Sequence, residues 1–259
     1  MIRRLLATHT VLVYLFLWLP IAVLAVFSFN AGRQTAIWRG FTLDWYRRLL
    51  ANDALLASVR NSLLVAALTT LIATVIGTLA ALALRRAGSH GGTLALLFLP
   101  MVIPEVVLGA ALLTFFGTVG LRLSLVTVVI AHVVFSVSYV TLVVRARLAG
   151  LDPALEEAAR DLGAGPVETF RRVTLPLIFP GIAASALLVF TLSIDDYVVT
   201  SFVAGVGATT LPLHVYSMLR VGVTPEVNAV STLLLAGTIG LIVAAQWLLR
   251  GSSREGGPE

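Results

Sequence analysis

Long apolar stretches alternate with short polar segments along this chain, and each stretch is about as long as a membrane-spanning helix. A hydrocarbon core about 30 Å thick needs roughly 20 apolar residues in a helix. Six stretches of the sequence meet that requirement: residues 11–29, 59–84, 93–116, 123–144, 177–203 and 229–249. The pattern predicts an all-α membrane protein with about six transmembrane helices in a single domain over residues 1–259.

The composition agrees with a bilayer as the solvent. The chain of 259 residues is 58% hydrophobic and 12% charged, whereas a soluble domain carries about 25% charged residues. A net charge of +5 in a soluble protein would suggest a nucleic-acid partner. Here the basic residues lie between the apolar stretches, so membrane topology explains them and we expect no nucleic acid to bind.

The first apolar stretch has two interpretations. Arg3 and Arg4 precede it, as basic residues precede a secretory signal. However, the stretch is longer than the usual signal core of about 7–15 residues, and no clear small-x-small cleavage site follows. We expect a retained first helix.

The distribution of arginines predicts the orientation of the chain in the membrane. With the N-terminus inside, eleven of the 18 basic residues face the cytoplasm: Arg3, Arg4, Arg85, Arg86, Arg145, Arg147, Arg160, Arg171, Arg172, Arg250 and Arg254. Four of the others lie in the outer loop 30–58. The excess is modest, but by the positive-inside rule it places both termini in the cytoplasm.

Two residue types are absent from the sequence, and both absences exclude a class of chemistry. There is no Cys, which excludes disulfides, thiolate catalysis and Cys-based metal sites. There is no Lys either, since all 18 basic residues are Arg. A P-loop needs a lysine for its phosphates, so we expect any ATPase to be a separate polypeptide.

The outer loop contains a candidate short helix over residues 41–50. Leu43, Tyr46, Leu49 and Leu50 recur on one helical face, and Thr42 is a plausible N-cap. Such a helix is expected to lie on the membrane surface. Trp45 and Tyr46 are then either interfacial anchors or part of the wall of an outer vestibule.

The third stretch carries two prolines four residues apart. Pro100 and Pro104 free backbone carbonyls and are expected to kink or break the helix just before Glu105. Transporters place broken helices at binding sites. A plain kink that shapes helix packing is the other interpretation.

The longest inner loop, residues 150–176, predicts a helix–turn–helix elbow in the cytoplasm. Asp152 can cap a helix that begins at Pro153, and Gly163 suits the left-handed position at its end. Pro166 then begins a second short helix, which we expect to end at the Arg171–Arg172 pair. The apolar face of the elbow suggests that another protein packs there; a well-capped connector is the alternative. This face consists of Leu155, Ala158, Ala159 and Leu162.

At this loop the sequence resembles the permeases of ABC importers. Glu157-Ala158-Ala159, Gly163 four residues on and the trailing Leu175-Pro176 are similar to the signature of that family. The resemblance implies an importer-permease fold in which the loop enters a cleft of a cytoplasmic ATPase and transmits its closure. It assigns this coupling role to Glu157, Ala158, Ala159, Asp161 and Gly163.

Further segments resemble the C-type subunit of spermidine/putrescine permeases along nearly the whole chain. They are Gly40–Tyr46, Asn61–Leu63, Leu192–Asp196, Leu211–Met218 and Val221–Ala229. The resemblance implies a substrate pathway that includes Trp45, Ser193, Asp195 and Asp196. Position 105 departs from that family, because it holds Glu where the relatives carry Asp; charge is kept but the reach is longer.

The resemblance also implies partners. They are a homologous second permease, two copies of a cytoplasmic ATPase and an extracytoplasmic substrate-binding protein, all at a bacterial inner membrane. ATP and Mg²⁺ are expected on the ATPase, with no cofactor and no metal on this chain.

The intramembrane carboxylates agree with a cationic cargo on independent grounds. Glu105, Asp195 and Asp196 lie inside apolar stretches, and no Arg lies in the central part of any stretch. A charged Asp at a helix centre costs about 2.5–3.5 kcal/mol, so these groups are expected to face water or a cation in transit. On one continuous helix Asp195 and Asp196 point about 100° apart, and the sequence does not tell which faces the pathway. The alternative is that both are merely solvated at the outer end of the span.

Enzyme chemistry finds little support. His132 and Ser136 lie one helical turn apart, but there is no Gly-x-Ser-x-Gly, no third triad member nearby and no His-Glu-x-x-His. Helix packing and interhelical hydrogen bonds explain this pair better.

The sequence as a whole predicts a permease subunit of an ATP-driven importer, working by alternating access on polyamines or similar small organic cations. Another cargo is the nearest alternative: a different cationic amine, an amino-acid-like compound or a metal ion. Metal is disfavoured because we expect no His or Cys in the neighbourhood of the carboxylates. A self-contained channel or secondary transporter would leave the elbow without a partner.

Overall fold

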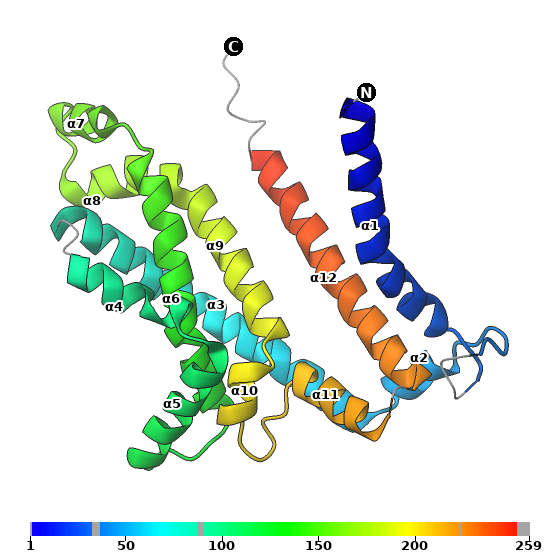
Figure 1. Ribbon diagram of the computed structural model, residues 1–259. Helices are drawn as coiled ribbons and strands as arrows, with labels where there is room; N and C mark the ends of the chain where they lie inside the picture. Colours follow the sequence, from blue (N-terminus) through cyan, green and yellow to red (C-terminus); the bar gives the residue numbers. More distant parts are fainter. Residues whose placement is uncertain (1, 33–36, 88–90, 223, 253–259) are drawn as a thin grey trace. The chain divides into compact units, whose positions relative to one another are not determined.

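The computed structural model describes residues 2–32, 37–87, 91–222 and 224–252 (Figure 1). Within these ranges the regular structure is helical, apart from one isolated β-bridge between Asn30 and Phe41. The C-terminal segment 253–259, which holds Arg254 of the orientation count, lies outside the described residues. The expected all-helical fold is confirmed.

The helices follow the apolar stretches in order (Figure 1). They are α1 (Ile2–Phe27), α2 (Asp44–Leu50), α3 (Asp53–Ala87), α4 (Gly91–Val102), α5 (Glu105–Thr118), α6 (Leu125–Ala149), α7 (Pro153–Asp161), α8 (Pro166–Thr169), the π-helical turn η1 (Phe170–Thr174), α9 (Leu175–Asp195), α10 (Val198–Val203), α11 (Leu211–Val221) and α12 (Pro225–Ser252).

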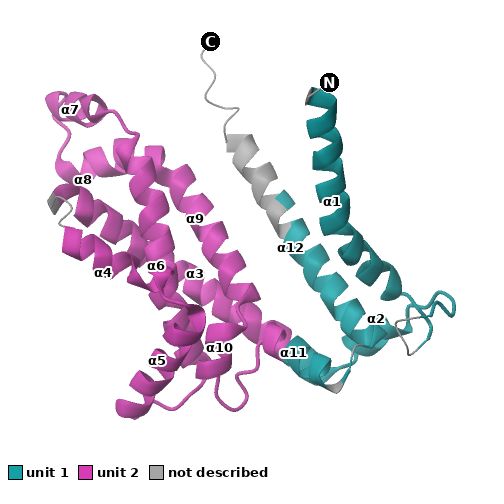
Figure 2. Cartoon of the chain, in the orientation of Figure 1, with its two compact units in different colours: residues 1–57, 214–259 teal, residues 58–213 magenta. Residues whose placement is uncertain are grey.

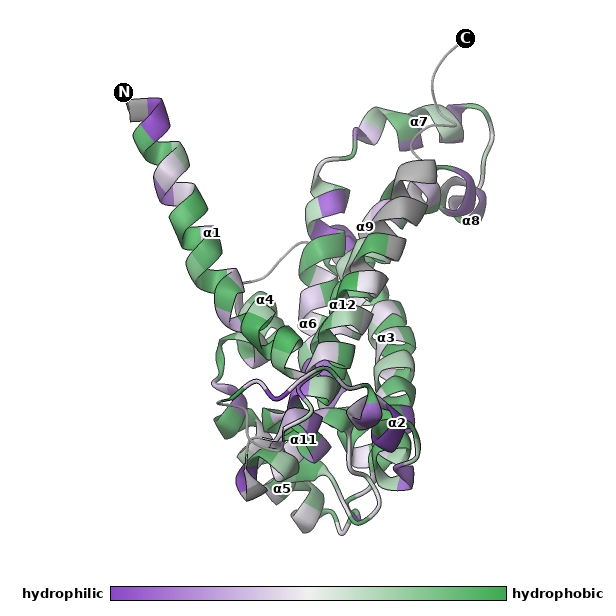
Figure 3. Ribbon diagram, turned by 90° about the vertical axis from the view of Figure 1, so that its right-hand side faces the viewer, coloured by the Kyte–Doolittle hydropathy of each residue, from purple (hydrophilic) through white to green (hydrophobic). Residues whose placement is uncertain are grey.

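Among the described residues four helical segments are long and apolar enough to cross a membrane. They are Arg3–Phe27, Asp53–Arg86, Leu125–Ala149 and Pro166–Asp195, and the bent pair α4–α5 makes a fifth if it is one span. Figure 3, in which the ribbon is coloured by hydropathy, shows that apolar residues predominate along these helices. The sixth predicted stretch, 229–249, falls within α12; after residue 240 most side chains of that helix lie outside the described residues.

The chain divides into two compact units (Figure 2). Unit 1 comprises residues 1–57 and 214–259, and unit 2 comprises residues 58–213. The elbow and all three intramembrane carboxylates belong to unit 2. That residues 1–259 form a single domain stays a prediction.

Unit 2 has two apolar clusters, both centred on α6. In the first, α3, α5 and α10 pack against it through residues such as Val65, Phe116 and Val199. In the second, α3 and α9 pack against it, with Ala73 and Ala81 among the buried residues. The small residues Ala73, Gly77 and Ala81 thus lie at a close helix contact, because a Cβ on Gly77 would meet Val140 of α6. Ser124 caps α6 in a capping box with Thr127, which fixes where this central helix begins.

The third predicted span, 93–116, is broken. α4 ends at Val102 and α5 begins at Glu105, with an angle of 104° between them. Pro104 occupies the N-cap position of α5 with an extended backbone (ψ 134°). A proline cannot donate a hydrogen bond to the previous turn and disfavours helical geometry in the residue before it, so the chain turns here. The predicted break is confirmed.

The prediction of one continuous fifth helix over 177–203 is wrong. α9 ends at Asp195, Asp196 adopts an extended backbone (φ −67°, ψ 122°), and the separate helix α10 follows at Val198. The prediction that Asp195 and Asp196 diverge by one helical step is therefore wrong as well. Neither Pro nor Gly marks this break in the sequence, and the side chain of Asp196 stabilises it, as described below.

Within unit 1, α12 packs against both α1 and α2. No residue in the apolar spanning window of α1 is buried. An apolar helix with an uncovered surface is expected where lipid or another membrane protein surrounds it.

The short outer helix differs in detail from the prediction. α2 begins at Asp44, and Thr42 is not its N-cap, although its hydroxyl accepts a hydrogen bond from the Asp44 N–H (3.2 Å). The face that the helix buries carries Trp45 and Leu49, whereas Leu50 is exposed. The predicted apolar face is therefore correct only in part: Leu49 is buried and Tyr46 half-buried, but Leu43 and Leu50 are exposed and Trp45 takes a buried position instead.

Candidate functional site

A pocket of about 350 Å³ opens in unit 2 where the two helix breaks meet. All three intramembrane carboxylates line it: Glu105 at the start of α5, and Asp195 and Asp196 at the end of α9. Tyr139, Phe135 and Tyr197 add aromatic rings to the wall. The rest of the lining is mostly apolar: Pro100, Met101, Ile103, Leu108, Thr191, Leu192, Val198 and Val199.

The break between α4 and α5 places Glu105 at this pocket. Glu105 is the first residue of α5 and is exposed. The N-terminal turn of a helix carries unpaired N–H groups and a partial positive charge, which stabilises a carboxylate there. Pro104 therefore both ends the helical path of α4 and places the acidic side chain of Glu105 at the pocket wall.

Asp195 and Asp196 have different environments. Asp195 is exposed, and no hydrogen bond or ion pair joins its carboxylate to another described residue. The Asp196 side chain is only 7% exposed. Its Oδ2 accepts hydrogen bonds from the backbone N–H of Thr200 (2.8 Å) and from the hydroxyl of Thr200 (2.6 Å). Asp196 thereby ties the break after α9 to the first turn of α10.

His132 completes a buried network around Asp196. Its ring is fully buried in α6, with Nε2 3.2 Å from Asp196 Oδ2 and 2.9 Å from the Thr200 hydroxyl. Its Nδ1 lies 2.8 Å from the hydroxyl of Ser193. Because the Thr200 hydroxyl gives its hydrogen to Asp196, both neighbours of Nε2 are acceptors. The network thus assigns a proton to Nε2.

This network corrects two expectations. The carboxylates are not without a basic neighbour, and His is not missing from their surroundings: His132, 64 residues away in the sequence, lies against Asp196. The expectation that interhelical hydrogen bonds explain His132 is confirmed. Ser136, by contrast, has no described hydrogen-bond partner for its hydroxyl. No group of three or more His, Cys, Asp or Glu suited to a metal ion occurs in the part of the chain that the structure describes.

Two residues of the expected pathway, Ser193 and Trp45, are not among the residues that line this pocket of unit 2. Ser193 is buried and faces His132. Trp45 belongs to unit 1, where its indole N–H donates to the carbonyl of Asn30 (2.8 Å) and the Arg48 guanidinium lies 5.1 Å from its ring centroid. Within unit 1 the indole N–H of Trp45 thus already has a hydrogen-bond acceptor, and its ring already has a cation partner.

The first half of the elbow forms as its sequence predicts. The Asp152 side chain accepts the Ala154 N–H, and Pro153 is the first residue of α7. At the other end Gly163 has φ +89°, and the Ala164 N–H bonds the carbonyl of Ala159. That pairing is the Schellman motif, in which glycine is preferred because it has no Cβ.

The second half of the elbow does not end where we expected. α8 continues through η1 directly into α9 without a stop at Arg171–Arg172. The π-helical turn carries the chain past this pair, so the elbow and the fifth span share one helical path. A π-turn inside a helix often marks a functional position.

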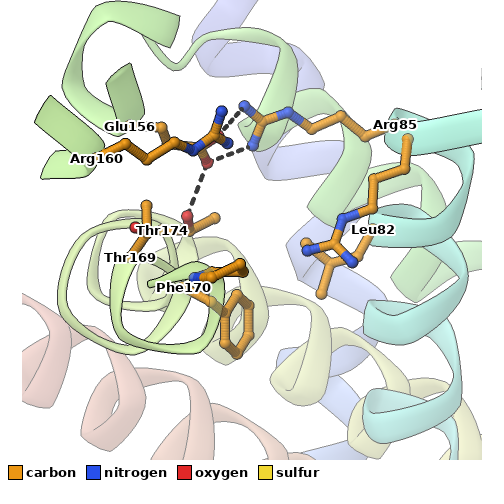
Figure 4. A pocket seen from close by; sticks show the side chains of 9 residues that line it. Leu82, Arg85, Glu156, Arg160, Thr169, Phe170 and Thr174 are labelled. Carbon is orange, nitrogen blue, oxygen red and sulfur yellow. Dashed lines mark hydrogen bonds and ion pairs between the residues drawn. The ribbon is translucent and has the colours of Figure 1, made fainter. Parts of the chain in front are cut away.

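Sequence reasoning missed Glu156 beside the signature residue Glu157. The guanidinium of Arg85 in α3 donates two hydrogen bonds to the Glu156 carboxylate, at 2.8 and 2.9 Å, and the Thr174 hydroxyl donates a third at 2.7 Å (Figure 4). These residues line a pocket of about 170 Å³. The signal in the sequence was the pair Glu156–Arg160 at i and i+4 together with the two arginines that end α3.

The environment of Glu156 favours its ionised form. Partial burial opposes ionisation, but the Thr174 hydrogen bond and the charge and hydrogen bonds of Arg85 outweigh it and hold the pKa below its ordinary value of 4.5. Glu156 is therefore a carboxylate at neutral pH.

The signature residues themselves lie on the outer surface of the elbow. Glu157, Ala158 and Asp161 are exposed, as is Gly163, while Ala159 is half-buried. Leu162 is 89% exposed and Val167 79%. A groove of about 260 Å³ lies between the two halves of the elbow, lined by Ala159, Leu162, Gly163, Ala164, Glu168, Thr169, Arg172 and Val173. An exposed apolar rim beside a groove is typical of a protein-binding surface.

Comparisons with known proteins agree with this arrangement. The chain is 41% identical to the putrescine transport system permease protein PotI of Escherichia coli strain K12, over 91% of this chain and 87% of that protein. It is 40% identical to the spermidine/putrescine transport system permease protein PotC of Haemophilus influenzae, over 92% and 93% of the two chains.

Solved structures agree on the fold. A chain of a bacterial ABC transporter involved in the import of the acidic polysaccharide alginate superposes with a TM-score of 0.78 at 16% identity, covering 96% of this chain and 95% of that one. A chain of the MetNI methionine ABC transporter superposes with a TM-score of 0.65 at 20% identity, covering 82% and 99%. The family described as "Binding-protein-dependent transport system inner membrane component" matches residues 73–254, and this chain, an inner-membrane permease subunit and not an enzyme, belongs to that family.

Proposed function

We propose that this permease moves polyamines, such as putrescine and spermidine, through the pocket formed by Glu105, Asp195 and Asp196. The pocket carries the proposal because it brings three carboxylates and three aromatic rings to one wall. A polyamine is a chain of methylene groups with ammonium groups along it. Carboxylates match the ammonium groups, and the apolar lining matches the methylene groups.

The chemistry of the pocket favours passage over tight binding. A cation loses water as it enters, and carboxylate oxygens replace part of its hydration shell; a transport site has to hold the cation weakly enough to release it. Aromatic faces add cation–π attraction of about 0.5–2 kcal/mol each. Asp195 and Glu105 are exposed and unpaired among the described residues. For this reason we assign to them the direct contact with the cargo.

The four-residue network of His132, Ser193, Asp196 and Thr200 plays a supporting part. Its hydrogen bonds converge on Asp196 Oδ2, and they fix the extended backbone between α9 and α10. In this account Asp196 and Ser193 set the position of Asp195, and Asp196 contributes negative potential to the pocket.

The proposed partners of this chain are inferred from the absence of Lys in its sequence and from the surface of its elbow. We propose a second homologous permease, an extracytoplasmic binding protein and two copies of an ATPase, which hold ATP and Mg²⁺. The absence of Lys excludes a P-loop on this chain. The printed names of the relatives, which call them permease proteins of transport systems, support the assembly. So does a solved neighbour in complex with its periplasmic protein.

The elbow is the proposed contact with the ATPase. Glu157, Ala158, Ala159, Asp161 and Gly163 present a charged and small-residue surface beside exposed leucines. When the ATPase closes on ATP, it moves the elbow, and the spans alternate between outward and inward access. In this proposal the elbow and both termini lie in the cytoplasm, as the arginine distribution predicts.

The test is ATP-dependent uptake by the assembled complex in proteoliposomes. We expect labelled putrescine to enter only with ATP and the binding protein present. Spermidine should compete, whereas a neutral amino acid and a divalent metal ion should not. Uptake without the ATPase would indicate a self-contained channel or secondary transporter, and uptake of one of the other cargoes without putrescine would replace the polyamine assignment.

A further inference from the structure

We infer that Glu156 is a positioning residue that fastens α7, the first helix of the elbow, to α3 and to the continuous path of η1 and α9, so that a force on α7 reaches both transmembrane helices together. The inference builds on the proposed function, in which the elbow receives the motion of an ATPase. We call the set of Arg85, Glu156 and Thr174 the Glu156 clamp (Figure 4).

The clamp joins three elements through one side chain. Arg85 lies in the last turn of α3, Glu156 in the first half of α7, and Thr174 at the end of η1, where α9 begins. Arg85 and Glu156 are 71 residues apart in the sequence, and Glu156 and Thr174 are 18 apart. Breaking this one carboxylate's contacts therefore frees α7 from two transmembrane helices at once.

The geometry of the clamp is specific. Two parallel N–H···O bonds between a guanidinium and a carboxylate fix the relative orientation of both groups, which a single-point contact does not. The Thr174 hydroxyl donates to Oε1, the oxygen that also accepts from Arg85 Nη1. Both oxygens of Glu156 are thus held.

Burial separates this ion pair from an ordinary surface pair. The Glu156 side chain is 17% exposed and that of Arg85 is 30% exposed, and Thr174 is buried. Arg172 and Glu168 form a second pair on the same elbow, but they are 77% and 45% exposed. Exposed pairs contribute little, whereas shielding from water strengthens the pair at Glu156.

The clamp matters because α7 has no other anchor of comparable strength. No residue of α7 is buried, so the helix makes no apolar core contact that would hold it to the spans. Its apolar side chain Leu155 is exposed, and so is Leu162, the residue at its C-cap. The neighbouring Glu157 also stays exposed. One glutamate therefore faces inward and holds the elbow in place, while the next faces outward to a partner.

The first test measures coupling in the assembled complex. Cargo uptake and ATP hydrolysis are measured in the same proteoliposomes for Glu156→Gln, Arg85→Gln, the double variant and Thr174→Val. We expect cargo moved per ATP to fall at least about fivefold in each single variant, with ATPase co-purification retained. The double variant of Glu156→Gln and Arg85→Gln should lose no more cargo moved per ATP than either single variant, because both substitutions break the same ion pair.

Ser185→Ala is the matched control for the loss of a buried hydroxyl. Ser185 is also buried and lies further along the same helical path, in α9, but its hydroxyl bonds only the carbonyl of Ile182 within its own turn. We expect it to keep wild-type coupling. Wild-type cargo per ATP in both Glu156→Gln and Thr174→Val, or additive losses in the double variant, would overturn the clamp.

A second measurement needs no cargo and no partner. The chain has no native Cys, so spin labels can be attached at Leu79→Cys in α3 and Leu155→Cys in α7, two exposed positions. We expect a narrow distance distribution in the full chain, a broadened one with Glu156→Gln or Thr174→Val, and no broadening with Ser185→Ala. An unchanged distribution in Glu156→Gln refutes the clamp. If the wild-type complex fails to import polyamines while Glu156→Gln still broadens the distribution, only the proposed function is refuted.

Discussion

Nε2 of His132 lies 3.2 Å from Oδ2 of Asp196, across the interface between α6 and the break that follows α9. The same oxygen accepts two hydrogen bonds from Thr200. This contact separates two neighbouring aspartates into a structural one, Asp196, and an unpaired one, Asp195. The first prediction tests that separation.

His132→Leu should destabilise the protein and lower uptake, because it removes one partner of a buried charge. Breaking such a pair costs about 3–5 kcal/mol. The measurement is the thermal unfolding midpoint of the purified chain, together with uptake at equal expression. Ser136→Ala is the matched control: it lies one turn away in α6, is buried, and has no described partner to lose. An unfolding midpoint equal to that of the wild type in His132→Leu would contradict the structural role assigned to Asp196.

Asp195→Asn and Asp196→Asn should have different effects on the stability of the folded protein. Asp196→Asn should lower the unfolding midpoint, because Oδ2 accepts three hydrogen bonds and a neutral amide replaces a carboxylate there. Asp195→Asn should leave the midpoint unchanged, because its carboxylate has no described partner. The comparison uses both variants side by side in one detergent. Equal losses of stability would contradict the assignment.

The elbow turn should depend on its glycine. Gly163 has φ +89°, and open space surrounds the position where a Cβ would sit, so backbone conformation alone limits substitution. A residue held there costs on the order of 1–3 kcal/mol if it disfavours positive φ. We expect Gly163→Val to reduce cargo moved per ATP and Gly163→Asn to be tolerated, because Asn enters the left-handed region more readily. Equal activity of the two variants would show that the turn is not constrained.

The contribution of Glu156 to stability should depend on pH in one direction. Its pKa is lower in the folded chain than its ordinary value of 4.5, so the stabilisation is full well above that value and is lost as pH falls through the folded pKa. The difference in unfolding midpoint between wild type and Glu156→Gln should stay constant from about pH 6 to 8 and shrink below about pH 4.5. A difference that instead disappears between pH 6 and 8 would contradict an ionised, clamped carboxylate.

The topology has a direct chemical test, because the native chain has no Cys. Leu162 in the elbow is 89% exposed, and Val206, after α10 at the other end of α9, is fully exposed. Leu162→Cys should react with an impermeant thiol reagent only from the cytoplasmic face, and Val206→Cys only from outside. Reversed labelling would overturn both the orientation and the contact with an ATPase.

Local chemistry made much of the fold predictable from the sequence. Asp152, Pro153 and Gly163 lie within one segment and act on their own backbone, so the first elbow helix followed from their types and spacing. Pro104 likewise marked the break before Glu105. The apolar stretches predicted the spans because length and hydrophobicity alone decide whether a helix can cross a bilayer.

The parts of the structure that could not be predicted from the sequence depend on contacts between residues far apart in the chain. The break after Asp195 has no Pro or Gly; it forms where Asp196 meets His132 and Thr200. The partner of Asp196 lies 64 residues away, beyond what a one-dimensional pattern gives. Similarly, the signature pointed to Glu157, but which of two adjacent glutamates faces Arg85 depends on how α7 lies against α3.

The measurement that tests the central claim most directly is putrescine uptake by the assembled complex carrying Glu105→Gln and Asp195→Asn, singly and together. Bonds to charged groups contribute about 1.5–3 kcal/mol, so each single variant should lower uptake about tenfold or more. ATPase co-purification should be unchanged, because the elbow is untouched. Glu105→Asp, which keeps the charge, should retain most activity. Wild-type uptake in the doubly neutralised protein would contradict the claim that these carboxylates carry a polyamine through the pocket.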